Sequence, residues 1–241
     1  VEISVHSAVP AGCGTGTSAA VAVALLGALA ALRDERLDAR DAAYAAYRLE
    51  VAGLGRESGV QDQLSAAYGG INYVEIDRFP EATVTHLPPW DGLDRLLTLV
   101  YLGRAHDSSA VHRQVIAESS GRGSPALSRL RDAATAARDA VVTQDLVAFG
   151  RAMILNTEAQ ESLHPALVGT DSRRVIAVAS ARHALGWKVN GAGGEGGSLT
   201  VLSPSESAKK ALDAAITAID SRFRIIPVRT SPLGLHVVGA V

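Results

Sequence analysis

Apolar residues recur along the chain with two kinds of spacing, and each predicts a different element. Spacings of three and four residues place apolar side chains on one face of a helix, whereas alternation or a short apolar run is typical of a strand. The first pattern predicts helices over residues 18–32, 37–51, 124–141, 145–164, 171–185 and 204–219. The second predicts strands over residues 1–9, 71–76, 96–103, 188–190, 198–202, 225–228 and 235–238. Helices and strands mix without a strict βαβ rhythm, so the predicted fold class is α+β.

Turn-forming residues indicate where elements begin and where the chain divides. The stretch Ser203-Pro204-Ser205-Glu206 has the form of a capping box with proline at the first helical position. Residues 79–92 are rich in proline and are expected to interrupt regular structure. We therefore predict a domain boundary there, with domains over residues 1–92 and 93–241.

Composition limits the classes of partner. The 241 residues are 47% hydrophobic, enough to bury a core, and the net charge of -2 gives no electrostatic footprint for nucleic acid or an anionic membrane. A small molecule is therefore the expected partner. A single cysteine, Cys13, excludes an internal disulfide and fits a reducing cytoplasm. The most apolar run, residues 19–32, is shorter than the ~20 residues that span a bilayer. Residues 1–9 alternate like a strand inside a domain and show no initiator Met, so we expect an N-terminal portion to be missing.

A glycine-rich loop over residues 10–20 is the most informative segment. Glycines let main-chain N–H groups approach a ligand closely, and the start of the following helix attracts an anion. The Walker A pattern requires a lysine, and none occurs in this loop. The dinucleotide fingerprint also fits poorly, because its third small position falls on Thr17. A strand-to-helix turn without a ligand remains the simple alternative.

This loop resembles the second signature of the GHMP kinases, Pro-x-x-x-Gly-Leu-Gly-Ser-Ser-Ala, with Thr15 in place of the leucine and Thr17 in place of the first serine. The resemblance implies that the loop binds the phosphates of ATP and that Ser18 helps to coordinate Mg²⁺. The implied cofactor-binding residues of this loop are Gly12, Cys13, Gly14, Thr15, Gly16, Thr17 and Ser18.

Two carboxylates follow the loop. Glu50 ends a stripe of small apolar residues on a predicted helix, and Asp62 lies in Ser58-Gly59-Val60-Gln61-Asp62-Gln63. This segment resembles the Gly-x-x-Asp-Gln motif of GHMP sugar kinases, above all the heptose 7-phosphate kinases and then the galactokinases. The resemblance implies that Asp62 is the catalytic residue beside the acceptor hydroxyl and that Glu50 binds Mg²⁺. A solvent-facing Glu50 at a frayed helix end and a helix-capping Asp62 remain the alternatives.

A second glycine cluster covers residues 188–197 and resembles the third GHMP signature, Lys-x-x-Gly-Ala-Gly-Gly-Gly-Gly. It adds four implied cofactor-binding residues: Gly191, Ala192, Gly193 and Gly194. Glu195 interrupts the glycine run, so either its carboxylate points away from the triphosphate or the loop contacts phosphate less directly. Arg104 is placed like an arginine of the heptose-phosphate kinases and is a candidate clamp for a substrate phosphate, although a surface salt bridge is the commoner use of an arginine.

Together the motifs imply an incomplete N-terminal domain of the ribosomal S5 domain 2-like type and a ferredoxin-like C-terminal domain. The implied function is a cytoplasmic, ATP- and Mg²⁺-dependent kinase that phosphorylates a hydroxyl of a sugar or sugar phosphate, with a heptose 7-phosphate-like acceptor favoured. The alternatives are a non-catalytic nucleotide or sugar sensor of the same fold, and a GHMP kinase for another acceptor, such as galactose or a mevalonate-like compound.

Overall fold

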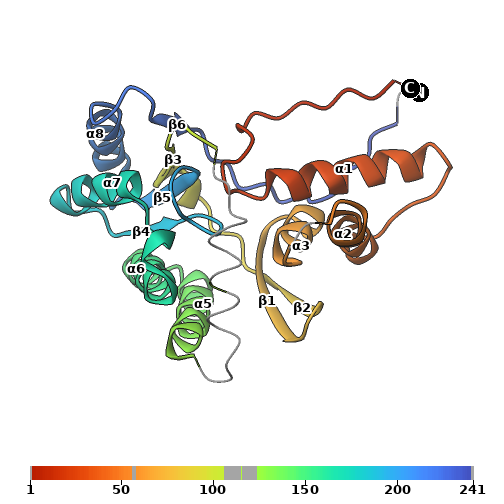
Figure 1. Ribbon diagram of the computed structural model, residues 1–241, viewed down its shortest axis with the longest axis horizontal. Helices are drawn as coiled ribbons and strands as arrows, with labels where there is room; N and C mark the ends of the chain where they lie inside the picture. Colours follow the sequence, from red (N-terminus) through yellow and green to blue (C-terminus); the bar gives the residue numbers. More distant parts are fainter. Residues whose placement is uncertain (1, 56–57, 106–114, 116–123, 240–241) are drawn as a thin grey trace. The chain divides into compact units, whose positions relative to one another are not determined.

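The computed structural model describes residues 2–55, 58–105, 115 and 124–239 (Figure 1). The chain forms two compact units that exchange short segments. The first unit consists of Val1–Ala8, Gly16–Pro89 and Thr230–Val241, and the second of Val9–Thr15 and Trp90–Arg229. The chain therefore passes from the second unit to the first in the middle of the first glycine loop.

Three helices and one hairpin build the first unit. They are α1 (Thr17–Ala31), α2 (Ala39–Arg48) with a π-helical turn (Leu49–Gly53), α3 (Gln61–Tyr68), β1 (Ile71–Arg78) and β2 (Glu81–Leu87). The Asp38 side chain caps α2 by accepting the Asp41 N–H at 2.7 Å. Small buried side chains such as Ala43 and Ala46 let the helices approach one another around Leu64. The antiparallel strands β1 and β2 pair beside them.

The segment Thr230–Val241 completes the core of the first unit. The Leu235 N–H donates to the Ala67 carbonyl at 3.0 Å, and the Gly70 N–H donates to the Ser231 carbonyl at 2.7 Å. The Leu235 side chain packs against Gly27 of α1, where a Cβ would lie 2.5 Å from Leu235 Cδ1. A side chain at residue 27 would therefore require the Leu235 side chain to shift.

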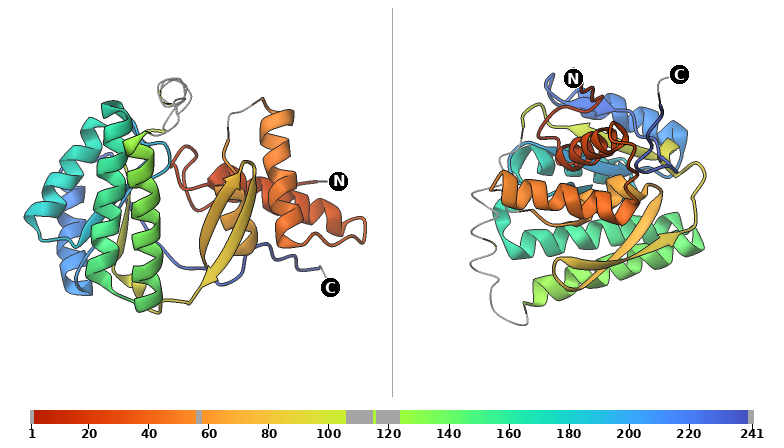
Figure 2. Two further views of the ribbon diagram at one scale, coloured as in Figure 1. Left: turned by 90° about the horizontal axis from the view of Figure 1, so that it is seen from below. Right: turned by 90° about the vertical axis from the view of Figure 1, so that its right-hand side faces the viewer.

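The second unit is a four-stranded antiparallel sheet with helices. Its strands are β3 (Leu97–Tyr101), β4 (Gly186–Val189), β5 (Ser198–Leu202) and β6 (Arg224–Ile226), in the order β4-β5-β3-β6. Its helices are α5 (Pro125–Thr143), α6 (Leu146–Leu163), α7 (Thr170–Ala181) and α8 (Glu206–Thr217). Val175 of α7 and Leu212 of α8 belong to the same buried cluster as the sheet residues Val100 and Leu199. Helices α5 and α6 lie side by side (Figure 2).

Most predicted elements are confirmed within a few residues, and the α+β class is confirmed with them. Two predicted strands are wrong, because residues 2–9 and 235–238 form none. A strand needs a neighbouring strand with which it exchanges repeated main-chain hydrogen bonds, and among the described residues neither segment pairs with a strand.

Two further local predictions are wrong. Residues 79–92 are not free of regular structure, because β2 lies within them and alternates apolar Ala82 and Val84 with polar neighbours. The prolines around this strand hid that signal. The cap of α8 is Ser205, which accepts the Ala208 N–H at 3.2 Å, so Pro204 precedes the helix. None of the helices in the described part of the chain combines the length and apolar character needed to cross a membrane.

Candidate active site

The first glycine loop turns sharply into α1. Gly12, Gly14 and Gly16 have φ angles of 71°, 76° and 72°, a left-handed conformation that residues with a Cβ rarely adopt. Gly16 is the N-cap of α1, and no side chain caps that end of the helix. The first N–H groups of a helix without such a cap can bind an anion.

The predicted ligand residues of this loop differ in what they can offer. Cys13 is fully buried with Leu99 and Ile226, so neither its side chain nor its main chain is exposed. Thr15 is exposed, and Thr17 is half-buried as the first residue of α1. Residues that carry a hydroxyl therefore flank Gly16 on both sides.

Within the second unit the two glycine loops meet. A Cβ at Gly14 would lie 3.3 Å from the carbonyl oxygen of Asn190, and one at Gly191 would lie 3.1 Å from the carbonyl oxygen of Gly14. Gly191 also has a positive φ of 59°. The loops approach so closely because neither carries a side chain at the contact.

Within the first unit, Asp62 lies against the continuation of the same loop. Asp62 is exposed in the first turn of α3, and a Cβ at Gly16 would lie 3.3 Å from its Cγ. The start of a helix favours the ionised form of a carboxylate. The residue predicted to be catalytic is thus brought next to the loop predicted to bind phosphate.

Glu50 forms the second carboxylate site of the first unit. Only 5% of its surface is exposed, and it lies in the π-helical turn after α2, a geometry frequent at functional sites. Its Oε1 accepts the Ser18 hydroxyl at 2.5 Å. Its Oε2 accepts the Ser58 hydroxyl at 2.9 Å and the Gln63 amide at 2.6 Å. The frayed, solvent-facing alternative for Glu50 is therefore wrong.

The Ser18 and Glu50 pair fits Mg²⁺ by its chemistry. Mg²⁺ prefers hard oxygen ligands and is commonly held by one or two carboxylates together with substrate phosphates. A carboxylate and a hydroxyl at hydrogen-bond distance supply such oxygens at the start of α1. In the described ranges no cluster of three or more His, Cys, Asp or Glu side chains could hold a metal unaided. Phosphate oxygens would have to complete the coordination.

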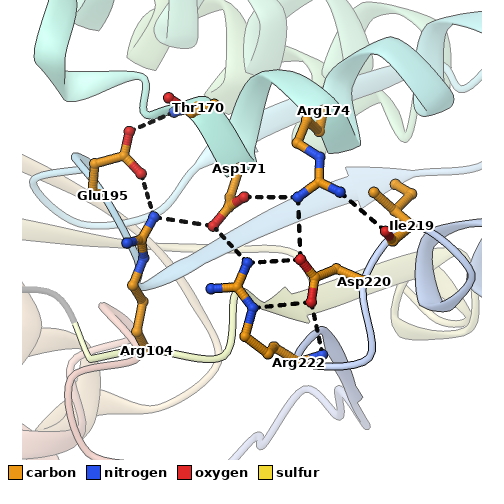
Figure 3. A network of polar contacts seen from close by, with 8 residues as sticks. All are labelled: Arg104, Thr170, Asp171, Arg174, Glu195, Ile219, Asp220 and Arg222. Atoms are coloured by element: carbon orange, nitrogen blue, oxygen red, sulfur yellow. Dashed lines mark hydrogen bonds and ion pairs between the residues drawn. The ribbon is translucent and has the colours of Figure 1, made fainter.

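Contacts with neighbouring segments hold the second glycine loop, residues 188–197. The Gly194 N–H donates to the Leu167 carbonyl at 2.8 Å, and the Gly193 N–H donates to the Asn190 carbonyl at 3.3 Å, so both amides are engaged. Ala192 is half-buried. Glu195 accepts the Thr170 N–H at 2.7 Å (Figure 3). Its negative charge therefore faces the start of α7.

Arg104 takes part in the same network (Figure 3). Its guanidinium donates to Glu195 at 2.5 Å and to Asp171 at 3.1 Å. Arg104 thus forms the salt bridge that was the alternative to binding a substrate phosphate. Both contacts are made by the same nitrogen, Nη2.

The sequence reasoning did not assign roles to Ser58 and Gln63, although both lie in the motif around Asp62. Gln63 is fully buried and donates to Glu50, and its own Oε1 has no hydrogen-bond partner among the described residues. Neighbouring residues on a helix point in different directions, so Gln63 cannot face the same group as Asp62. This spacing was the signal in the sequence that Gln63 contacts a different residue.

Residues 1–70 match the family model described as GHMP kinases N terminal domain, and they contain the first glycine loop, Glu50 and Asp62. The predicted resemblance to the GHMP kinases is thereby confirmed for this part of the chain.

Two relatives are similar to most of the chain. A mevalonate kinase of Pyrococcus abyssi is 26% identical over 217 residues, which cover 86% of this chain and 60% of that protein. A mevalonate kinase of Thermococcus sibiricus is 29% identical over 220 residues, which cover 88% of this chain and 62% of that protein. The chain thus spans about three fifths of the length of these relatives.

The crystal structure of a D-glycero-D-manno-heptose 1-phosphate kinase from Bacteroides thetaiotaomicron matches with a TM-score of 0.67 and 23% identity, over 91% of this chain and 61% of that one. This likeness confirms the GHMP kinase fold. The heptose phosphate acceptor stays a prediction, because the relatives matched by sequence are mevalonate kinases.

Proposed function

We propose that this chain is part of an ATP- and Mg²⁺-dependent kinase that transfers the γ-phosphoryl group of ATP to a hydroxyl of a small molecule. One observation carries the proposal. Two carboxylates from different elements converge on the start of α1, since Asp62 lies against Gly16 and Glu50 accepts the Ser18 hydroxyl. Anion binding alone would not need two negative charges beside a phosphate loop.

Each group has a role in the proposed reaction. The main-chain N–H groups around Gly16 and the positive end of α1 would bind ATP phosphate oxygens. Asp62 would accept or orient the proton of the attacking hydroxyl, whose oxygen forms a bond to the γ-phosphorus as the bond to the β-phosphate oxygen breaks. Ser18 and Glu50 would hold Mg²⁺, which neutralises charge on the phosphates when bound. Phosphoryl transfer needs chiefly alignment and charge neutralisation, and these residues provide both.

For the acceptor we propose a heptose phosphate, on the strength of the Gly-x-x-Asp-Gln form of the motif around Asp62. A mevalonate-like acid is the second candidate, because the curated relatives that match most of the chain are mevalonate kinases. The two acceptors differ in the anionic group that the enzyme must recognise.

The test is a panel of acceptors. Full-length protein is incubated with ATP and Mg²⁺ plus heptose 7-phosphate, galactose, mevalonate or homoserine, and ADP release is measured. We expect turnover with one acceptor class. Saturable nucleotide binding without turnover on any acceptor would instead support a sensor.

Replacing the proposed base tests its role. We expect Asp62→Asn to fold like wild type and to lose roughly 10²–10⁴-fold in kcat, the range typical of general-base catalysis. The matched control is Asp132→Asn, an exposed aspartate on α5, which should leave kcat unchanged. Near-wild-type turnover of Asp62→Asn would remove Asp62 from the mechanism.

A further inference from the structure

The second glycine loop, residues 188–197, contains one residue that can hold it in place. Five of the seven residues from Gly191 to Gly197 are glycine, and glycine loses more conformational freedom on ordering than any other residue. Gly193, Gly194, Gly196 and Gly197 all have positive φ angles. Such a loop keeps one conformation only if contacts outside it compensate that entropy. Glu195, at its centre, has the only long side chain in this stretch.

Glu195 links the loop to two other segments of the second unit (Figure 3). Its Oε1 accepts the Thr170 N–H at 2.7 Å, and its Oε2 accepts the Arg104 guanidinium at 2.5 Å. Thr170 is the first residue of α7, where a negative charge is favoured by the helix dipole. Both hydrogen bonds are charge-assisted, the stronger class of hydrogen bond.

Arg104 is itself held by a buried group. Asp171 is 5% exposed and accepts a hydrogen bond from Arg104 at 3.1 Å. Arg174 and Arg222 also face Asp171, at 3.0 and 3.7 Å, and both pair with Asp220 (Figure 3). The partner of Glu195 is therefore part of a connected network on the body of the second unit.

Main-chain contacts hold the loop on both sides of Glu195. The Gly194 N–H donates to the Leu167 carbonyl at 2.8 Å, and the Gly197 N–H donates to the Arg104 carbonyl at 3.0 Å. The start of the loop, at Gly191, lies against Gly14 of the first glycine loop. The position of Gly191 against the phosphate loop thus depends on how firmly the rest of the loop is held.

We infer that Glu195 is a positioning residue that links the second glycine loop to Arg104 and to the start of α7. It thereby fixes the main chain that lies against Gly14. Its carboxylate is held by the Thr170 N–H and the Arg104 guanidinium, and these two contacts restrict the flexibility of the loop. The expected effect on nucleotide affinity rests on the proposed function. The expected effect on the loop does not.

Two variants separate these effects. Glu195→Gly removes both contacts. Glu195→Gln keeps an oxygen for the Thr170 N–H, but it loses the charge and places an NH2 donor opposite the Arg104 guanidinium, so the contact with Arg104 is lost. Hydrogen exchange of the amides of residues 191–197 is measured first. We expect exchange to be at least roughly tenfold faster in Glu195→Gly, because charge-assisted hydrogen bonds are lost. Glu195→Gln should lie between this variant and wild type, and exchange in β5 should be unchanged in both.

Nucleotide affinity is measured second, with a non-hydrolysable ATP analogue and Mg²⁺. We expect the Kd of Glu195→Gly to rise roughly tenfold and that of Glu195→Gln to rise less, in the order of their exchange rates. In turnover assays the KM for ATP should follow Kd while kcat stays within about threefold, since the loop positions and does not react. A purely structural role would lower the melting temperature without this graded change.

The outcomes are distinguishable. Unchanged exchange over residues 191–197 in Glu195→Gly overturns the inference that Glu195 holds the loop. Faster exchange with an unchanged Kd overturns the link to the phosphate loop. If the wild-type protein binds no nucleotide, the proposed function has failed, and the exchange data alone still decide whether Glu195 holds the loop.

Discussion

Glu50 in the first unit and Asp171 in the second are both carboxylates with 5% of their surface exposed, but their partners differ in charge. The described residues that hydrogen-bond to Glu50 are neutral: Ser18, Ser58 and Gln63. Those around Asp171 are cations: Arg104, Arg174 and Arg222.

The difference in charge of their partners indicates that Glu50 is suited to binding a ligand and Asp171 to stabilising the fold. Burying an ion costs several kcal/mol unless an opposite charge and hydrogen bonds offset it. Three arginines offset this cost for Asp171, so no further ligand is needed. Hydroxyls and an amide satisfy the hydrogen bonds of Glu50 but leave its charge, which a bound cation would neutralise. Glu50 is thus suited to Mg²⁺, and Asp171 to holding the second unit together.

The largest effect is expected for Glu50→Gln. We expect kcat to fall roughly 10²–10³-fold, because several kcal/mol of stabilisation by a bound metal would be lost. The melting temperature should stay the same or rise, since the variant removes a buried charge that has only neutral hydrogen-bond partners among the described residues. Activity is assayed across a Mg²⁺ titration and melting by calorimetry. Wild-type turnover at every Mg²⁺ concentration would show that Glu50 is structural, like Asp171.

The converse variant is Asp171→Asn. We expect a loss of about 2 kcal/mol of stability, below the ~3–5 kcal/mol typical of a broken buried pair, because the three arginines are half-exposed and remain partly hydrated. That loss corresponds to a melting temperature lower by roughly 4–8 °C. Unlike Glu50→Gln, this variant should keep kcat within about threefold. A large loss of kcat with unchanged melting would reverse the two roles.

The smallest effect is expected for Asp220→Asn, and it depends on pH. Hydrogen bonds from the Arg222 guanidinium, and then from the Arg222 main-chain N–H, hold the pKa of Asp220 below the usual aspartate range. A carboxyl whose pKa is lower in the folded state contributes stability above its unfolded pKa of ~3.9, and loses it as pH falls toward the folded value. Wild type should therefore be more stable than Asp220→Asn at pH 7, and the difference should shrink below about pH 4. Urea unfolding at pH 7, 4 and 3 measures this, and a constant difference would contradict it.

The spacing of apolar residues was enough to predict the elements that depend mainly on their own residues. The range of β5, Ser198–Leu202, was predicted to the residue, and α1 was displaced by one residue at each end. Alternation alone failed over residues 1–9 and 235–238, because a strand also depends on a distant partner. The loop and carboxylate residues of the site came from the resemblance to GHMP kinases, which carries information that periodicity lacks.

Contacts between residues distant in sequence could not be predicted. Glu195 and Arg104 are 91 residues apart, so the sequence could show that a carboxylate interrupts a glycine run but not which way it points. The hydrogen bond from Ser18 to Glu50 spans 32 residues and depends on how α1 packs beside α2. In both places tertiary packing, which no local pattern encodes, decides whether a charge serves binding or structure.

The exchange of segments between the units has a consequence for synthesis on the ribosome. Residues 230–241 are translated after every residue of the second unit, yet they supply Leu235 to the core of the first. Domains generally fold in the order in which they are made. Here the first unit, although begun earlier, must leave the Gly27 face of α1 uncovered until the second unit has been translated. A chain that ends at Arg229 would therefore contain every residue of the second unit but would lack the Leu235 side chain of the first.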